Sequence, residues 1–152
     1  MLINSKIPLV FGIPQCGFFG FLKGRRVFVA ELRPGLEGIK TVADQAKAEG
    51  ADPVVVCDNM LAFCMERGLV SAVHIFYGSL RTKKAICRTG SLIAAICGQE
   101  HKIPVYLHKG TARRVRPSSL LKIDGRTVTS RGIKTYAPLA EEVPLSLVSK
   151  IQ

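Results

Sequence analysis

The chain has 152 residues, 47% of them hydrophobic, which suits one domain with a single buried core. It has no apolar run long enough to cross a bilayer and no small-residue cleavage site near its start, so we expect neither a membrane anchor nor a signal peptide. The 22 Lys and Arg against 11 Asp and Glu give a net charge of +11, which predicts an anionic partner.

The five cysteines form no C-x-x-C pair, and the three histidines are dispersed along the chain. A disulfide framework and a zinc site both need closer or more regular spacing than this. We therefore expect reduced thiols, a cytoplasmic location, no metal site and no cofactor.

Apolar runs and helical periodicity alternate along one predicted domain, residues 1–152, in which 1–24 is the least defined part. The runs predicted as strands are residues 7–13, 26–31, 54–57, 72–77 and 103–107. Residues 15–20 are predicted as a Gly-broken loop. Helices are predicted at residues 36–50, at 59–67, and from Thr89 or Ser91 to Gln99.

The remaining segments are predicted as connections and edge pieces. Residues 78–88 form a basic loop, and residues 120–128 an antiparallel edge piece. An extended segment covers 136–143, and a terminal helix with Pro144 in its first turn covers 144–151. Alternation of strands and helices is typical of parallel sheets with right-handed crossovers. The chain is thus predicted to have an α/β fold, a Rossmann-like open, mostly parallel sheet with helices on both faces.

The strand at 26–31 ends in charged residues, Pro34 and two glycines, and a helical pattern begins at once. Open α/β sheets bind ligands at the carboxyl ends of their strands, which places Glu31 and Arg33 at the mouth of a site. Two simpler interpretations stay open. The turn serves only to redirect the chain, or Glu31 and Arg33 form a buried salt link that braces it.

Several cations follow other predicted strands and favour binding of a phosphate group. They are Arg33, Lys83, Arg88 and Lys109, assisted by the backbone N–H groups of Gly90 and Ser91 at a helix start. The alternative for each cation is a surface ion pair or a solvated loop. Asp58 is predicted to cap the helix that follows it rather than to act as an acid.

These motifs resemble the C-terminal domain of the translation initiation factor 2B alpha/beta/delta family, which includes methylthioribose-1-phosphate isomerase and ribose-1,5-bisphosphate isomerase. The resemblance runs from about residue 26 to the end and lacks the helical N-terminal domain. The matching segments are E-x-R-P-x-x-x-G at 31–38, D-N-M-x-A-x-x-M at 58–65, G-S at 90–91 and h-x-I-P-h-Y at 101–106.

The chain departs from the isomerases where the resemblance places their chemistry. Their catalytic Asp falls on Gly78, their substrate-facing Gln on Glu37, and their Asn-Lys on Cys87 and Arg88. Only Cys16, beside a glycine, matches their catalytic Cys, and a lone Cys there is more often a small buried hydrophobe.

Two functions therefore stay open. The favoured one is a non-catalytic module, similar to the initiation factors, that binds a phosphorylated ligand or assembles. The alternative is an aldose-1-phosphate to ketose-1-phosphate isomerase with a rearranged active site, for which Cys16 is the candidate catalytic residue.

The predicted partners are a phosphorylated small molecule, such as a sugar phosphate or nucleotide, and a second copy of the chain. The basic clusters follow strands and are expected to converge on one edge, so nucleic acid is the less favoured ligand, with 113–116 as its best support. The candidate dimer surfaces are residues 7–21 and 58–65, although 7–21 folded over its own sheet explains its apolar character equally well.

Overall fold

The structure, a computed structural model, describes residues 5–111, 120–123, 125–128 and 132–152. Its centre is an eight-stranded sheet in which six strands run parallel in the order β10-β6-β4-β1-β2-β3. These strands are β1 (Ile7–Phe11), β2 (Arg26–Ala30), β3 (Asp52–Val56), β4 (Val70–Leu80), β6 (Val105–Lys109) and β10 (Lys150–Ile151). Two more strands, β5 (Lys84–Arg88) and β9 (Ala140–Pro144), add to β4 in antiparallel order.

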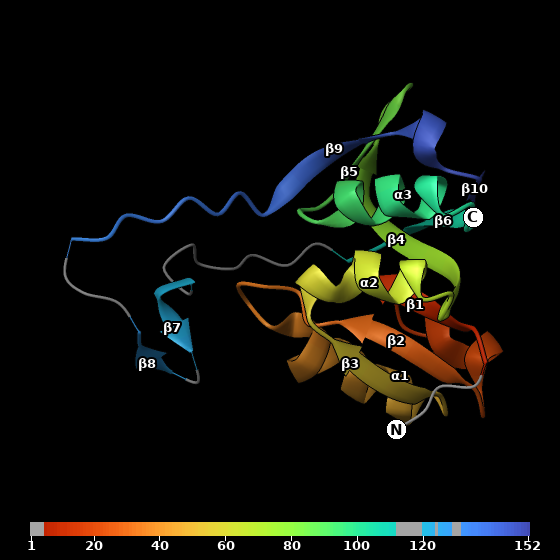
Figure 1. Ribbon diagram of the computed structural model, residues 1–152, viewed down its shortest axis with the longest axis horizontal. Coiled ribbons are helices and arrows are strands. Elements are labelled where there is room, and N and C mark those ends of the chain that lie inside the picture. Colours follow the sequence, from red (N-terminus) through yellow and green to blue (C-terminus); the bar gives the residue numbers. More distant parts are fainter. Residues whose placement is uncertain (1–4, 112–119, 124, 129–131) are drawn as a thin grey trace.

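Helices cover both faces of this sheet, so the predicted α/β fold with a mostly parallel sheet is confirmed (Figure 1). One face carries α2 (Leu61–Glu66) and α3 (Ser91–Glu100), where Val73 of β4 lies against Gly98 of α3. The other face carries α1 (Ala43–Ala48) and a 3-10 helix, Phe18–Leu22. None of the described helices is long and apolar enough to cross a membrane.

Each apolar run that was predicted as a strand forms one, because runs without polar alternation suit strands covered on both faces. The clearest case is β1, whose five residues are all buried between β2 and β4. The start of the chain is therefore part of its own sheet. The loop predicted at 15–20 partly forms the Phe18–Leu22 helix, which the Glu49 carboxylate of α1 ties down by accepting N–H bonds from Gly17 and Phe19.

The basic loop predicted at 78–88 is wrong, because this segment forms a β-hairpin. Strand β4 continues to Leu80, and the N–H of Arg81 donates to the carbonyl of Lys84 at the turn. Along β5 the small side chains of Ala85 and Cys87 are buried while Lys84 is exposed. This period-two pattern supports a strand despite the high charge of the segment.

The predicted terminal helix at 144–151 is also wrong. A single 3-10 turn, Leu145–Leu147, is followed by β10. The N–H of Ser149 donates to the carbonyl of Val105, and the N–H of Gln152 to that of Leu107. Pairing of β10 with β6 satisfies backbone carbonyl groups at the edge of the sheet, which a terminal helix would have left unpaired.

The helix predicted at 36–50 begins with a π-helical turn, Gly38–Val42, and continues as α1. Its start is pressed against the end of β2, where a Cβ on Gly38 would lie 1.7 Å from the carbonyl oxygen of Ala30. Only glycine allows this approach, so Gly38 fixes where the turn after β2 enters the helix.

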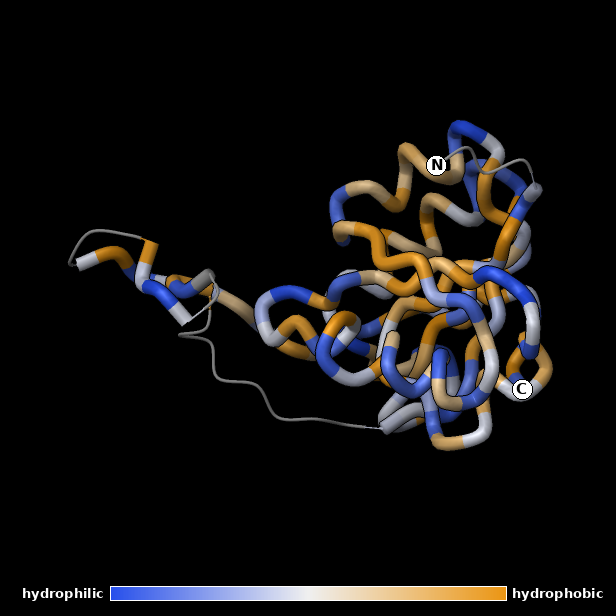
Figure 2. The backbone as a smooth tube through the Cα atoms, turned by 90° about the horizontal axis from the view of Figure 1, so that it is seen from below, coloured by the Kyte–Doolittle hydropathy of each residue, from blue (hydrophilic) through white to orange (hydrophobic). Residues whose placement is uncertain are grey.

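An arm, defined here as residues 120–123, 125–128 and 132–139, extends away from the rest of the chain (Figures 1 and 2). It contains β7 (Lys122–Ile123) and β8 (Arg126–Thr127), which pair with each other and with no strand of the main sheet. The edge piece predicted at 120–128 is thus a separate small hairpin. The extended segment predicted at 136–143 ends the arm and enters β9 at Ala140.

Candidate functional site

The side chain of Asp58 stabilises the turn that follows β2. Its carboxylate accepts hydrogen bonds from the backbone N–H groups of Leu32 (2.9 Å) and Arg33 (2.7 Å). The helix-cap role predicted for Asp58 is therefore wrong: the cap position is Cys57, and no side chain caps this helix. The carboxylate instead satisfies N–H groups in a turn where Leu32 and Leu36 both have positive φ, and a cis bond joins Arg33 to Pro34.

A buried ion pair joins this turn to β5. The guanidinium of Arg88 donates from Nη1 to Oε1 of Glu37 (2.8 Å) and from Nη2 to Oε2 (3.0 Å). The side chains of Arg88 and Glu37 are 7% and 6% exposed. Nη2 also reaches the backbone carbonyls of Leu32 (3.2 Å) and Arg33 (3.4 Å). Arg88 thus serves the turn rather than facing solvent.

The start of α3 is occupied in the same way by a carboxylate of the chain. Oε1 of Glu141, in β9, accepts N–H bonds from Gly90 (2.7 Å) and Leu92 (2.8 Å). Ser91 is fully buried, and its hydroxyl has no hydrogen-bond partner among the described residues. Of the two N–H groups predicted to bind phosphate here, that of Gly90 already donates to Glu141.

The other predicted ligand-binding residues do not converge. Glu31 and Arg33 are half-buried, and no ion pair joins them, although both are described. Lys83 lies in the turn of the β4–β5 hairpin. Lys109 is the last residue of β6 and pairs with Tyr77 of β4. Arg33, Arg88 and Gly90 lie near one another at the carboxyl edge of the sheet. Lys83 lies at the tip of the hairpin, and Lys109, although it ends a strand at the same edge, lines a separate hollow.

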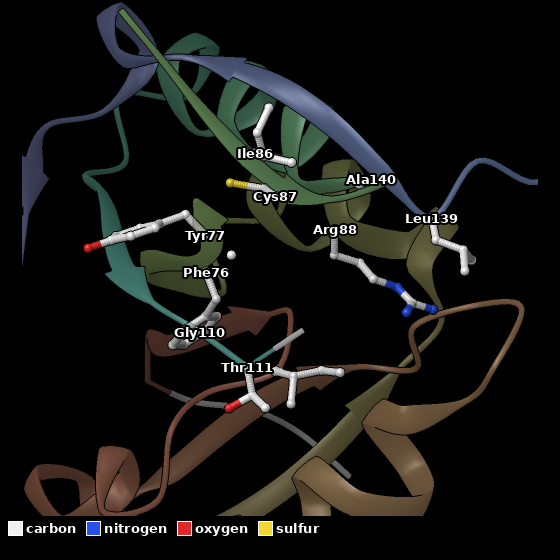
Figure 3. A pocket seen from close by; sticks show the side chains of 11 residues that line it. Phe76, Tyr77, Ile86, Cys87, Arg88, Gly110, Thr111, Leu139 and Ala140 are labelled. Carbon is white, nitrogen blue, oxygen red and sulfur yellow. The ribbon is translucent and has the colours of Figure 1, made fainter. Parts of the chain in front are cut away.

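A cavity of about 150 Å³ lies at this carboxyl edge, between β4, β5 and the ends of β1 and β6 (Figure 3). Its walls are mostly apolar, and its described ionisable side chains are Tyr77, Cys87 and Arg88. In Figure 3 the guanidinium of Arg88 points away toward the turn after β2. Burial and the nearby Glu141 carboxylate raise the pKa of the Cys87 thiol to about 12, so it stays protonated and unreactive.

Cys16 is exposed and lies outside this cavity, in a separate hollow with His108 and Lys109. Gly78, the position of the isomerases' catalytic Asp in the resemblance, lines the cavity beside a register shift of β4. Among the described residues, no group of three or more His, Cys, Asp or Glu is placed to hold a metal ion.

Two histidines that the sequence presents as dispersed lie side by side on the sheet. Nδ1 of His74 is 2.9 Å from Nε2 of His108, under the ring of Phe18. Burial first, and His108 second, lower the pKa of His74 to about 4, and burial also lowers that of His108. Both residues lie on the same face of two adjacent strands, β4 and β6. The sequence alone does not show this, because it does not give the register of the two strands.

The fold and this edge cavity define an open α/β domain in which Arg88 and the Gly90 N–H, both predicted to bind a ligand, are bound by the chain's own carboxylates. The model of the Initiation factor 2 subunit family matches residues 21–151, so the chain belongs to that family. The predicted resemblance to the C-terminal domain of this group is thereby confirmed.

Relatives and solved structures agree with this membership. Methylthioribose-1-phosphate isomerase of Nostoc sp. is 27% identical over 141 residues, covering 83% of this chain and 41% of the relative. That of Carboxydothermus hydrogenoformans is 26% identical, covering 85% and 42%. The chain thus spans about two fifths of the length of the curated relatives it matches.

The solved structures support the fold. Translation initiation factor eIF-2B subunit delta from A. fulgidus has a TM-score of 0.80 at 17% identity, covering 97% of this chain and 52% of that one. The 5-methylthioribose 1-phosphate isomerase from Pyrococcus horikoshii OT3 has a TM-score of 0.79 at 18% identity, covering 97% and 50%.

Replacing Arg88 by Met should lower the free energy of unfolding by about 3 kcal/mol or more, because Glu37 is left buried without its partner. The matched control is Arg26→Met, whose partner Asp52 is exposed, and it should cost at most about 1 kcal/mol. Urea unfolding measures both, and the double variant Glu37→Leu/Arg88→Met should recover much of the loss. Equal effects of the two single variants would contradict the bracing role.

The stability of the chain should fall by about 2 kcal/mol between pH 7 and 5, because the unfolded chain protonates His74 near its ordinary pKa while the folded chain does not. Because the pKa of His74 is lower in the folded chain than in the unfolded chain, the contribution of His74 to stability is fully present above pH 6.5. It is lost as the pH falls toward 4. Urea unfolding at several pH values checks the slope. His74→Gln should flatten it, while Gln at the exposed His101 should leave it unchanged; an unaltered slope in His74→Gln would refute the assignment.

Proposed function

We propose that this chain is a non-catalytic module of the Initiation factor 2 subunit family that acts by assembling with a second copy of itself. The observation that supports this most directly is the buried pair of Glu37 and Arg88 at the cavity wall. The cation nearest to the cavity is neutralised by the chain, and Glu141 occupies the adjacent helix start.

A phosphorylated ligand at Arg88 would have to displace the Glu37 carboxylate. That carboxylate is 6% exposed, and it would be left buried beside a dianionic phosphate. Breaking a buried, bidentate ion pair costs several kcal/mol, which the new contact has to exceed. If a phosphorylated ligand binds elsewhere on this edge, Arg33 is the one predicted cation near the turn after β2 that could contact it.

The described cavity also lacks groups suited to proton transfer. Isomerisation of an aldose phosphate needs one group to open the ring and another to move a proton between adjacent carbons. No carboxylate or histidine is among the described residues that line it. Besides Tyr77 and the ion-paired Arg88, the cavity offers Gly78 at the strand end and a Cys87 thiol whose pKa is raised to about 12. Cys16 lines a different hollow.

The alternative function, sugar-phosphate isomerase, is favoured by the names of the relatives. We expect no ketose product when the purified chain is incubated with methylthioribose 1-phosphate or ribose 1,5-bisphosphate, because no acid/base pair faces the cavity. Product analysis by chromatography or NMR measures this. Turnover that Cys16→Ser abolishes, while the matched exposed-thiol control Cys57→Ser keeps it, would replace our proposal with the isomerase.

The surface for assembly is the outer side of α2 and α3, which contact each other on one face of the sheet (Figure 1). Large apolar side chains are exposed there: Met60 (40%), Phe63 (50%), Ile93 (57%) and Ile96 (49%). The segment 58–65 that the sequence nominates for a dimer contributes the first two. A two-fold dimer would bring this face against its own copy and remove these side chains from water.

Sedimentation at tens of micromolar should give a dimer, and Phe63→Glu/Ile93→Glu should give a monomer because charges would be buried in the contact. Ile39→Glu, at an apolar side chain of similar exposure (44%) outside α2 and α3, should remain dimeric. A monomeric parent chain would rule out this assembly.

A further inference from the structure

The segment from Lys109 to Tyr136, which includes most of the arm, concentrates positive charge. From Lys109 to Tyr136 the sequence has eight Lys and Arg and one acidic residue, Asp124, a net of +7 out of +11 for the whole chain. The surplus therefore lies in less than a fifth of the sequence. The rest of the chain is close to balanced for its size.

The cations of the arm that the structure describes are free to bind a partner. Lys122, Arg126 and Lys134 are exposed and make no salt bridge within the described part of the chain. Cations near the carboxyl edge differ from them, since Arg88 is paired with Glu37 and Lys84 with Glu142. The described part of the arm thus offers an anion three cations without a salt bridge, away from the cavity (Figures 1 and 2).

The same arm holds the most exposed large hydrophobic side chain among the described residues. Tyr136 is 90% exposed, two positions after Lys134. Val128 and Ile133 are 55% and 54% exposed. An aromatic ring exposed to solvent near a cation matches the way unpaired bases are bound, by stacking on a ring while the phosphates contact Lys and Arg.

We propose that the arm binds single-stranded nucleic acid through Lys122, Arg126, Lys134 and Tyr136. Lys122 and Arg126 lie on the two strands of the β7–β8 hairpin, and Lys134 lies on the chain that follows it. Three cations over this length of chain suit a series of phosphates better than one small phosphorylated ligand. Stacking on Tyr136 requires an unpaired base, which a duplex does not present. The described arm contains a short hairpin and extended chain without a helix, so it lacks the amphipathic helix that lies on membranes.

Filter binding or fluorescence anisotropy with labelled poly(U) and oligo(dT), across a series of salt concentrations, tests the proposal with the full chain. We expect binding that weakens steeply with salt. Lys122→Glu/Arg126→Glu/Lys134→Glu should weaken it at least about tenfold and lower the magnitude of the salt slope by about 2, the value for loss of three phosphate contacts on a single strand.

The control is Lys6→Glu/Lys40→Glu/Lys47→Glu, which makes the same change in net charge at exposed lysines of the main body. It should retain binding within about threefold, since long-range attraction is screened at 0.15 M salt. Tyr136→Ala should weaken binding about fivefold or more with the salt slope unchanged, because stacking releases no counterions. Strands β7 and β8 pair with no strand of the main sheet, so these substitutions should leave unfolding midpoints unaltered.

Equal losses in the arm and body variants would mean that only net charge matters, and the proposal would be wrong. Equal or tighter binding of a duplex of the same length would overturn the single-strand assignment. No binding of either strand, with binding to anionic phosphatidylserine vesicles instead, would assign the arm to a lipid surface and overturn it as well.

Discussion

The ion pair of Glu37 and Arg88 is the contact on which the carboxyl edge of the sheet depends. It links a turn that follows β2 to β5, two elements with no strand pairing between them, through two hydrogen bonds between nearly buried groups. Since each charge is buried, each needs the other, and the turn and the hairpin are fixed relative to one another. The cavity between them takes its shape from this constraint.

Two further carboxylates act by the same principle. Asp58 satisfies N–H groups of the turn after β2, and Glu141 satisfies those at the start of α3. Sheet edges and helix starts offer unsatisfied N–H groups that attract anions in many proteins of this architecture. In this chain the anions at these two positions are the side-chain carboxylates of Asp58 and Glu141.

The sequence predicts the strands better than the site, for a physical reason. Continuous apolar runs such as 7–11 and 54–56 are local and need no knowledge of their neighbours. The hairpin at 78–88 and the last strand fail because their pairing partners, β9 and β6, lie far along the chain. Glu37 and Arg88 are 51 positions apart, so their charges are visible in sequence while their contact is not. The pairing of His74 and His108 requires the register of β4 and β6.

The distribution of charge separates two regions with different electrostatic roles. In the main body, Glu141 accepts N–H bonds at a helix start and Glu37 is paired with Arg88, so these polar groups stabilise the fold. On the arm, Lys122, Arg126 and Lys134 make no salt bridge with any described carboxylate, so their like charges repel one another. That repulsion does not stabilise a hairpin as short as β7–β8. Such repulsion is expected where cations are kept to bind a partner. A polyanion would remove the repulsion, because its phosphates would neutralise the cations.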